Sequence, residues 1–276
     1  MYDTLIDPKV LFDHLEDSAW CVIDCRASLT DPLAGSTAYA AGHVPGAIFA
    51  DLATDLSGPL IPRITGRHPL PDPTVLAETF GDWGVERHTQ VVAYDAGNGA
   101  YAARAWWLFR WLGHPGVAVL NGGLAAWQAE RYPLRLGVEH RRVVAFPVRD
   151  ALTRAVSVAD LLERGASMDL VDARAEARFR GEVEPIDPVA GHIPGARCLP
   201  FEGNLDRDGR FAAPEVLRHR FETNARAGLE VVCYCGSGVT ACHNILAMRY
   251  AGLPEATLYP GSFSEWIRDP ARPVER

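Results

Sequence analysis

The chain has 276 residues, 48% hydrophobic and 22% charged, which is enough for two domains that each bury a core. Its formal net charge of -8 argues against a general affinity for nucleic acid or anionic membranes. The six cysteines are too sparse for a disulfide scaffold, and we find neither a membrane-length apolar run nor a signal-like N-terminus. These features predict a cytoplasmic protein.

Strand-like runs of apolar and β-branched residues alternate with helix-like segments along the chain. The runs are residues 21–24, 91–94, 117–120, 170–171 and 231–234, and the clearest helix-like segments are 101–111 and 239–250. Trp107, Leu108 and Trp111 recur at helical spacing, which we interpret as core packing rather than a cofactor site. The alternation predicts an α/β fold with parallel strands covered by helices.

The chain contains one internal duplication. Residues 41–47 return almost unchanged as residues 190–196. Three further pairs follow in the same order, namely 22–26 with 170–174, 91–95 with 231–235, and 122–127 with 261–266. We therefore predict two tandem domains over residues 1–133 and 156–276, joined by a linker over 134–155, each with a mainly parallel central sheet flanked by helices.

The duplicated turn contains His43 in the first half and His192 in the second. Each histidine lies in a Gly-His-(Val/Ile)-Pro-Gly-Ala sequence, where the glycines give backbone freedom and the proline fixes φ. We interpret both histidines as structural.

A cysteine lies where the apolar run 231–234 gives way to a small-residue loop and then a helix. Cys235 there would lie at the positive end of the helix, near backbone N–H groups of the loop, and both features favour a thiolate. The sequence therefore offers a nucleophile. Loop residues Gly236, Gly238, Val239 and Thr240 would supply N–H groups to an anion bound beside it.

Together, the repeated Asp-x-Arg strand ends, the two turns and the loop 235–240 resemble the tandem-domain rhodanese superfamily. That resemblance implies sulfurtransferase activity through a persulfide on the cysteine of the C-terminal domain, with no metal and no cofactor. Asp95 occupies the matching position of the first half, so we expect that half to be catalytically silent.

The loop sequence Cys-Gly-Ser-Gly-Val-Thr is similar to that of the 3-mercaptopyruvate sulfurtransferases of this superfamily. Thiosulfate sulfurtransferases commonly carry cations after the cysteine, which suits a dianion, whereas Gly236 and Ser237 leave room for a monocarboxylate. We therefore favour 3-mercaptopyruvate as donor. The alternatives are a thiosulfate:cyanide sulfurtransferase and a non-enzymatic rhodanese-like binding module. The acceptor would be a thiol or cyanide, with a thioredoxin-like protein as one candidate partner.

The same resemblance implies that His68 lies near Ser237, so that a hydroxyl and an imidazole assist proton transfer. An acidic partner is expected beside this pair. The matching position is Ala53, between Asp51 and Asp55, so the sequence does not identify the acid.

Arg178 is similar to the family arginine that binds the donor's carboxylate. A second arginine is expected several residues later, where this chain has Ile186. Arg180 is one candidate to replace it.

Two other chemistries fit the cysteine loop poorly. A cysteine phosphatase needs an arginine six residues after the nucleophile, where this chain has Ala241. A zinc site built from Cys233, Cys242 and His243 with Cys235 lacks paired Cys-x-x-Cys spacing. We expect Cys242 to be a small buried helix residue.

Overall fold

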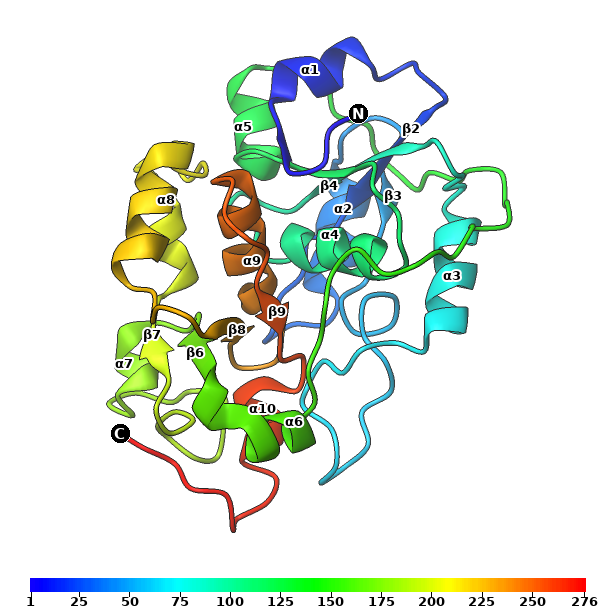
Figure 1. Cartoon of the computed structure of the whole chain (residues 1–276). Coiled ribbons are helices and arrows are strands. Elements are labelled where there is room, and N and C mark those ends of the chain that lie inside the picture. Colours follow the sequence, from blue (N-terminus) through cyan, green and yellow to red (C-terminus); the bar gives the residue numbers. More distant parts are fainter. The chain divides into compact units, whose positions relative to one another are not determined.

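The computed structural model describes residues 1–276, apart from the side chain of Ala166. The chain forms two compact units (Figure 1). Unit 1 consists of residues 1–58, 71–152 and 207–210, and unit 2 of residues 59–70, 153–206 and 211–276. The segment 59–70, which lies inside the first half of the sequence, thus groups with unit 2.

Unit 1 is built on a five-stranded sheet in the order β1-β5-β4-β2-β3, with every pairing parallel. Its strands are β1 (Leu5–Ile6), β2 (Trp20–Asp24), β3 (Ile48–Phe49), β4 (Gln90–Tyr94) and β5 (Val117–Leu120). Its helices are α1 (Pro8–Asp13), α2 (Ala34–Ala41), α3 (Pro73–Asp82), α4 (Ala102–Trp111) and α5 (Gly123–Ala129).

Unit 2 is built on a four-stranded parallel sheet in the order β7-β6-β8-β9. Its strands are β6 (Met168–Asp172), β7 (Arg197–Cys198), β8 (Glu230–Tyr234) and β9 (Thr257–Leu258). Its helices are α6 (Val158–Arg164), α7 (Glu176–Phe179), α8 (Pro214–Thr223), α9 (Thr240–Tyr250) and α10 (Ser262–Trp266), with short 3-10 turns at Gly165–Ser167 and Phe201–Asn204. The predicted parallel sheets flanked by helices are confirmed in both units.

Each unit closes its core with a tryptophan from the duplicated segment after its last central strand. Trp127 belongs to the buried core cluster of unit 1 together with the strand residues Val22 and Val92, and Trp266 belongs to the core cluster of unit 2. Each indole N–H donates to a proline carbonyl a few residues further on, at 2.8 Å in both units. Within α4, Trp107 and Leu108 are fully buried, which confirms that these positions belong to the core.

Helix starts follow local sequence signals. Asp72 accepts hydrogen bonds from the N–H groups of Thr74 and Val75 at the start of α3, with Pro73 in the first helical position. Ser157 and Asp160 form a reciprocal capping box at the start of α6.

The repeated Asp-x-Arg sequence forms a buried ion pair at the end of β2 in unit 1 and of β6 in unit 2. Asp172 and Arg174 are 2.7 Å apart at their nearest atoms, and Arg174 also donates to the carbonyl oxygen of Gly191 at 2.7 Å. Asp24 and Arg26 make the matching 2.7 Å pair in unit 1. The repeated motif therefore ties the strand end to the following turn in both units.

The duplicated histidine turns have the structural role predicted for them. His43 Nδ1 lies 2.8 Å from the carbonyl oxygen of Tyr39, and His192 Nδ1 lies 2.8 Å from that of Phe179. Gly46 and Gly195 have φ values of 77° and 75°, which favour glycine.

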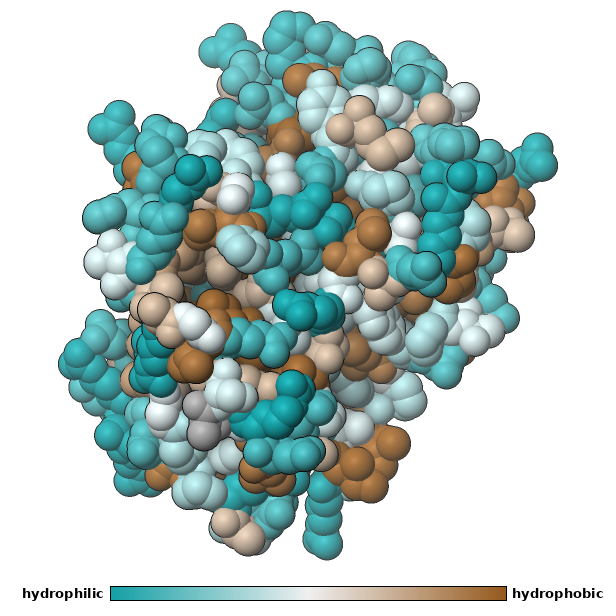
Figure 2. Space-filling model, in the orientation of Figure 1, coloured by the Kyte–Doolittle hydropathy of each residue, from teal (hydrophilic) through white to brown (hydrophobic). Residues whose placement is uncertain are grey.

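In the described part of the chain, no helix is both long and apolar enough to cross a membrane. Exposed large hydrophobic residues such as Leu33, Ile64 and Leu136 are spread along the sequence. The face drawn in Figure 2 mixes hydrophilic and hydrophobic residues, as is usual for protein surfaces.

Candidate active site

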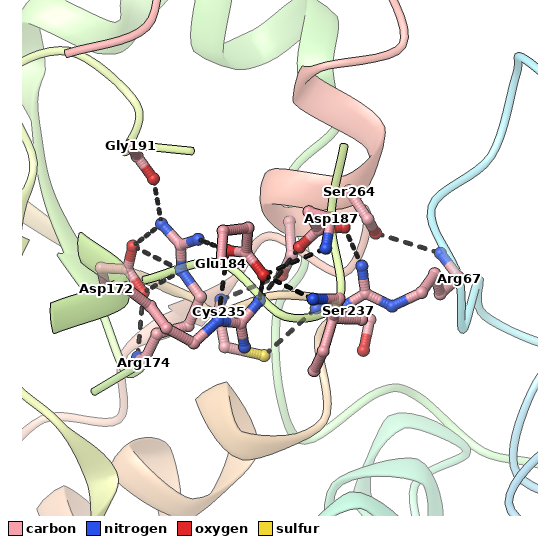
Figure 3. A network of polar contacts seen from close by, with 12 residues as sticks. Arg67, Asp172, Arg174, Glu184, Asp187, Gly191, Cys235, Ser237 and Ser264 are labelled. Carbon is pink, nitrogen blue, oxygen red and sulfur yellow. Dashed lines mark hydrogen bonds and ion pairs between the residues drawn. The ribbon is translucent and has the colours of Figure 1, made fainter. Parts of the chain in front are cut away.

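Cys235 is the first residue after β8 and lies in the loop that leads into α9. The residue is only 2% exposed. Its sulfur accepts hydrogen bonds from the N–H groups of Ser237 at 3.4 Å and Gly238 at 3.1 Å (Figure 3). The loop therefore turns the N–H groups of Ser237 and Gly238 toward the sulfur; of the four residues expected to supply N–H groups, Gly238 is the one seen to do so.

Three hydrogen bonds to α10 fix this loop. The N–H of Cys235 donates to Ser262 Oγ at 3.1 Å. The N–H groups of Phe263 and Ser264 donate to the carbonyl oxygens of Cys235 and Gly236, both at 3.0 Å. α10 thus holds the backbone of Cys235 and Gly236, while the N–H groups of Ser237 and Gly238 donate to the sulfur.

The turn also depends on a glycine. Gly238 has φ +77°, and a methyl group built on it would lie 2.4 Å from the carbonyl oxygen of Pro260. We expect Gly238→Ala to lower the free energy of unfolding by about 2–4 kcal/mol, because it adds a backbone clash to an unfavourable φ. The free energy of unfolding is measured by chemical denaturation of the full-length protein.

Gly228→Ala is the matched control. Gly228 has nearly the same φ, +78°, but nothing lies within 4 Å of the added methyl group. It should cost only about 1 kcal/mol. Equal losses in the two variants would contradict a role for the close approach to Pro260.

The corresponding loop of unit 1 shows what this turn can hold. Asp95 is buried, and its carboxylate accepts four backbone hydrogen bonds. The donors are Gly97 at 3.0 Å, Gly99 at 2.9 Å, Tyr101 at 2.9 Å and Ala102 at 3.3 Å. Burial raises the pKa of Asp95, while these N–H groups act to lower it. In unit 1 the loop is thus an anion cradle filled by the chain's own carboxylate.

His68 and Ser237 are brought together. His68 Nδ1 lies 2.8 Å from Ser237 Oγ, and Ser237 is buried. His68 lies in the segment 59–70, which groups with unit 2 although it falls within the first half of the sequence. Chemically, the pair can move a proton between a ligand beside Ser237 and the imidazole.

The carboxylates on either side of Ala53 accept hydrogen bonds from backbone N–H groups of the same turn. Asp51 Oδ1 accepts from the N–H groups of Ala53 at 2.8 Å and Thr54 at 3.0 Å. Asp55 Oδ2 accepts from the N–H of Asp51 at 2.8 Å. These bonds account for both carboxylates as turn-capping groups.

Arg178, at the end of α7, is held by two carboxylates. Its guanidinium donates to Glu184 at 2.7 and 3.2 Å and to Asp187 at 3.1 Å. A methyl group built on Gly236 would lie 3.7 Å from each terminal nitrogen of Arg178. The guanidinium predicted to bind a carboxylate therefore lies beside the cysteine loop.

A second guanidinium lies even closer to that loop, and the sequence analysis missed it. Arg67 forms an ion pair with Asp187, and its Nη2 lies 2.7 Å from the position of a methyl group built on Gly236. The backbone N–H of Arg67 donates to Ser264 Oγ at 3.0 Å, which connects this residue to α10 (Figure 3). The available signal was its place in the chain, directly before His68.

Arg180 lies elsewhere. Its side chain is 58% exposed and pairs with Glu176 and Glu182 on the surface. Ile186 is also exposed, and its N–H donates to Glu184 Oε1 at 3.0 Å.

The pKa values of the two carboxylates that hold Arg178, Glu184 and Asp187, are shifted in opposite directions. Burial acts to raise the pKa of Glu184, but hydrogen bonds from Arg178 and from the N–H groups of Asp187 and Ile186 outweigh it and lower the pKa. Burial prevails for Asp187, whose pKa is raised although Arg67 and Arg178 favour its charged form.

The structure also places the other residues that the sequence singled out around Cys235. Val239 is buried and Thr240 is the first residue of α9. Cys242 Sγ lies 3.3 Å from the carbonyl oxygen of Gly238, and the His243 ring stacks on Phe211. Among the described residues, no group of three or more His, Cys, Asp or Glu side chains could hold a metal ion.

Each unit has a parallel sheet in which one strand, β4 or β8, leads into a loop of the same kind, and the loop of unit 2 carries a cysteine. This arrangement defines a tandem rhodanese architecture. The profile of the rhodanese-like domain matches residues 7–130 and again 155–269. The chain belongs to the rhodanese family, so the resemblance seen in the sequence is confirmed.

The chain is similar along nearly its whole length to named sulfurtransferases. It is 50% identical over 275 residues to a Pseudomonas aeruginosa protein provisionally named a 3-mercaptopyruvate sulfurtransferase, covering 98% of this chain and 97% of that one. It is 38% identical over 263 residues to SseB of Mycobacterium tuberculosis, provisionally named a thiosulfate sulfurtransferase, covering 92% and 90%. The crystal structure of the 3-mercaptopyruvate enzyme SseA from Escherichia coli superposes with a TM-score of 0.83 at 32% identity, covering 96% and 100%.

Proposed function

We propose that this protein moves a sulfane sulfur from 3-mercaptopyruvate to a thiol or to cyanide through a persulfide on Cys235. The observation that carries the proposal is the buried Cys235 sulfur, which accepts two backbone N–H groups. The Ser237 and His68 pair and two guanidiniums lie around the same loop. The names of the P. aeruginosa and E. coli relatives support the choice of donor.

In the first step, the Cys235 thiolate attacks the donor's sulfur. The new bond is sulfur to sulfur, and the donor's carbon–sulfur bond breaks with its electron pair going to carbon. This leaves the enolate of pyruvate, which takes a proton at carbon. The proton that leaves the donor's thiol balances the one that the enolate gains, so no oxidant or reductant is required.

The way the unit 1 loop binds the Asp95 carboxylate supports the proposal that the Cys235 loop binds a persulfide. The terminal sulfur of a cysteine persulfide is as many bonds from Cβ as a carboxylate oxygen of Asp95 is from its own Cβ. Gly99 and Tyr101, which donate to Asp95, correspond by spacing to Val239 and Ala241 in the Cys235 loop. We infer that these two N–H groups stabilise the terminal sulfur's charge.

In the second step, a thiolate or cyanide attacks the terminal sulfur and releases the Cys235 thiolate. A thiol acceptor becomes a persulfide, and cyanide becomes thiocyanate. A thioredoxin-like protein would be a thiol acceptor of this kind. We propose a reducing, cytoplasmic setting for this chemistry, because six cysteines in 276 residues are too few for a disulfide scaffold.

Ser237 and His68 have the geometry to carry the donor's thiol proton. We expect Ser237→Ala and His68→Gln each to lower kcat/KM for 3-mercaptopyruvate by roughly a hundredfold. Thiosulfate has no thiol proton, and sulfite leaves without needing one, so turnover of thiosulfate should fall far less. Equal losses with both donors in steady-state assays would contradict a proton-transfer role.

The identity of the preferred sulfur donor is tested by comparing turnover of 3-mercaptopyruvate and of thiosulfate at equal concentration, with cyanide as acceptor. We expect a higher kcat/KM with 3-mercaptopyruvate. A preference for thiosulfate would instead support the second candidate, which the name of SseB favours. No turnover of either donor would support a non-enzymatic binding module.

A further inference from the structure

We propose that Asp187 selects the charge of the sulfur donor by partly neutralising Arg67 and Arg178, the two guanidiniums beside Gly236, and that Arg67 is a donor-binding residue. This inference rests on the proposed function and adds to it the residues that discriminate a monoanionic from a dianionic donor.

Asp187 bridges the two arginines. One carboxylate oxygen pairs with Arg67 Nη1, and the other accepts from Arg178 Nη2 at 3.1 Å. The Asp187 side chain is only 3% exposed, so little water screens its charge. Figure 3 shows Asp187 beside Arg67, close to the loop of Cys235 and Ser237.

Arg67 retains hydrogen-bond donors for a ligand. Its Nε is buried and has no hydrogen-bond partner among the described residues. Its Nη2 is the guanidinium nitrogen nearest to a methyl group built on Gly236. Because Nε–H and one Nη2–H point the same way, they form an edge that can bind two oxygens of one anion, while Nη1 is engaged by Asp187. A buried donor left over on this edge is the feature that points to an anionic ligand.

The charges of the network are balanced before a donor binds. Three guanidiniums, from Arg67, Arg174 and Arg178, face three carboxylates, from Asp172, Glu184 and Asp187. Arg174 and Asp172 are paired with each other, and Glu184 is shared between Arg174 and Arg178. Asp187 is therefore the carboxylate that offsets Arg67.

Repulsion from Asp187 scales with the charge of the bound donor. A Coulomb energy is proportional to each charge, so Asp187 disfavours a thiosulfate dianion about twice as strongly as a 3-mercaptopyruvate monoanion. Removing its charge should therefore help thiosulfate more. A residue that merely held the arginines in place would change both donors alike.

The test is the ratio of kcat/KM for thiosulfate to that for 3-mercaptopyruvate, measured for the wild type and for Asp187→Asn. We expect the ratio to rise by roughly tenfold in the variant. An unchanged ratio, while the wild type turns over 3-mercaptopyruvate, would overturn the inference and leave the proposed function intact. Absence of turnover with the wild type would instead be failure of the proposed function itself.

Two further variants make the result specific. Arg67→Gln should raise KM for both donors and shift the ratio the opposite way, which keeps the inference testable if Asp187→Asn does not fold. An unchanged KM in Arg67→Gln would overturn the donor-binding role of Arg67. Glu176→Gln removes the same unit of charge from an exposed surface pair with Arg180, and it should leave the ratio unchanged.

Discussion

Replacing Cys235 with serine is expected to lower sulfur transfer from either donor by roughly a thousandfold or more. A serine hydroxyl in the same cradle cannot form a persulfide, so the covalent route is lost rather than slowed. The loop should remain folded, because its anchors to α10 use backbone groups and the hydroxyl of Ser262. The measurement is steady-state turnover with each donor and cyanide.

Cys198→Ser is the matched control for this prediction. Cys198 is a free thiol of unit 2, on β7, and burial raises its pKa to about 12. It therefore stays protonated near neutral pH, and its replacement should leave turnover within about twofold. Comparable losses in the Cys198 and Cys235 variants would contradict the assignment of the nucleophile.

The second large effect is on stability, at the buried ion pair that ends β6. Arg174 makes three hydrogen bonds to the Asp172 carboxylate, donates to the carbonyl of Gly191 and lies 4.2 Å over the ring of Phe263. Arg174→Ala should lower the free energy of unfolding of unit 2 by about 3–5 kcal/mol, because it leaves Asp172 charged and fully buried without its partner.

Hydrogen exchange of β6 and β8 across a denaturant series would measure this change within unit 2. Arg180→Ala is the control, since Arg180 pairs with two exposed glutamates and its replacement should cost less than about 1 kcal/mol. A loss in Arg174→Ala no larger than that of the control would show that the buried pair contributes little.

The fold could be predicted where the chain repeats itself. The duplicated strand ends and turns carry residues whose types are dictated by local geometry, such as Gly46 and Gly195 with positive φ. Strands of two residues, such as β1 and β9, were beyond prediction because they are too short to show an alternating pattern. The assignment of segment 59–70 to unit 2 depends on long-range contacts that no local pattern encodes.

The candidate site was predicted in part. Position at a strand-to-helix loop was enough to single out Cys235, whereas the pairing of His68 with Ser237, 169 residues apart, was expected only from the family resemblance. Arg67 was missed because its ion pair with Asp187 spans 120 residues and involves an irregular segment. Sequence reasoning instead looked for the second arginine near Arg178, where Arg180 is turned to the surface.

The persulfide on Cys235 is the central claim, and it can be observed directly. The protein is incubated with 3-mercaptopyruvate in the absence of an acceptor, and the peptide containing Cys235 is examined by mass spectrometry. We predict that this peptide gains the mass of one sulfur atom, that cyanide removes the gain, and that Cys235→Ser never shows it. A sulfur atom found on another cysteine, or turnover without any sulfur on Cys235, would contradict the account.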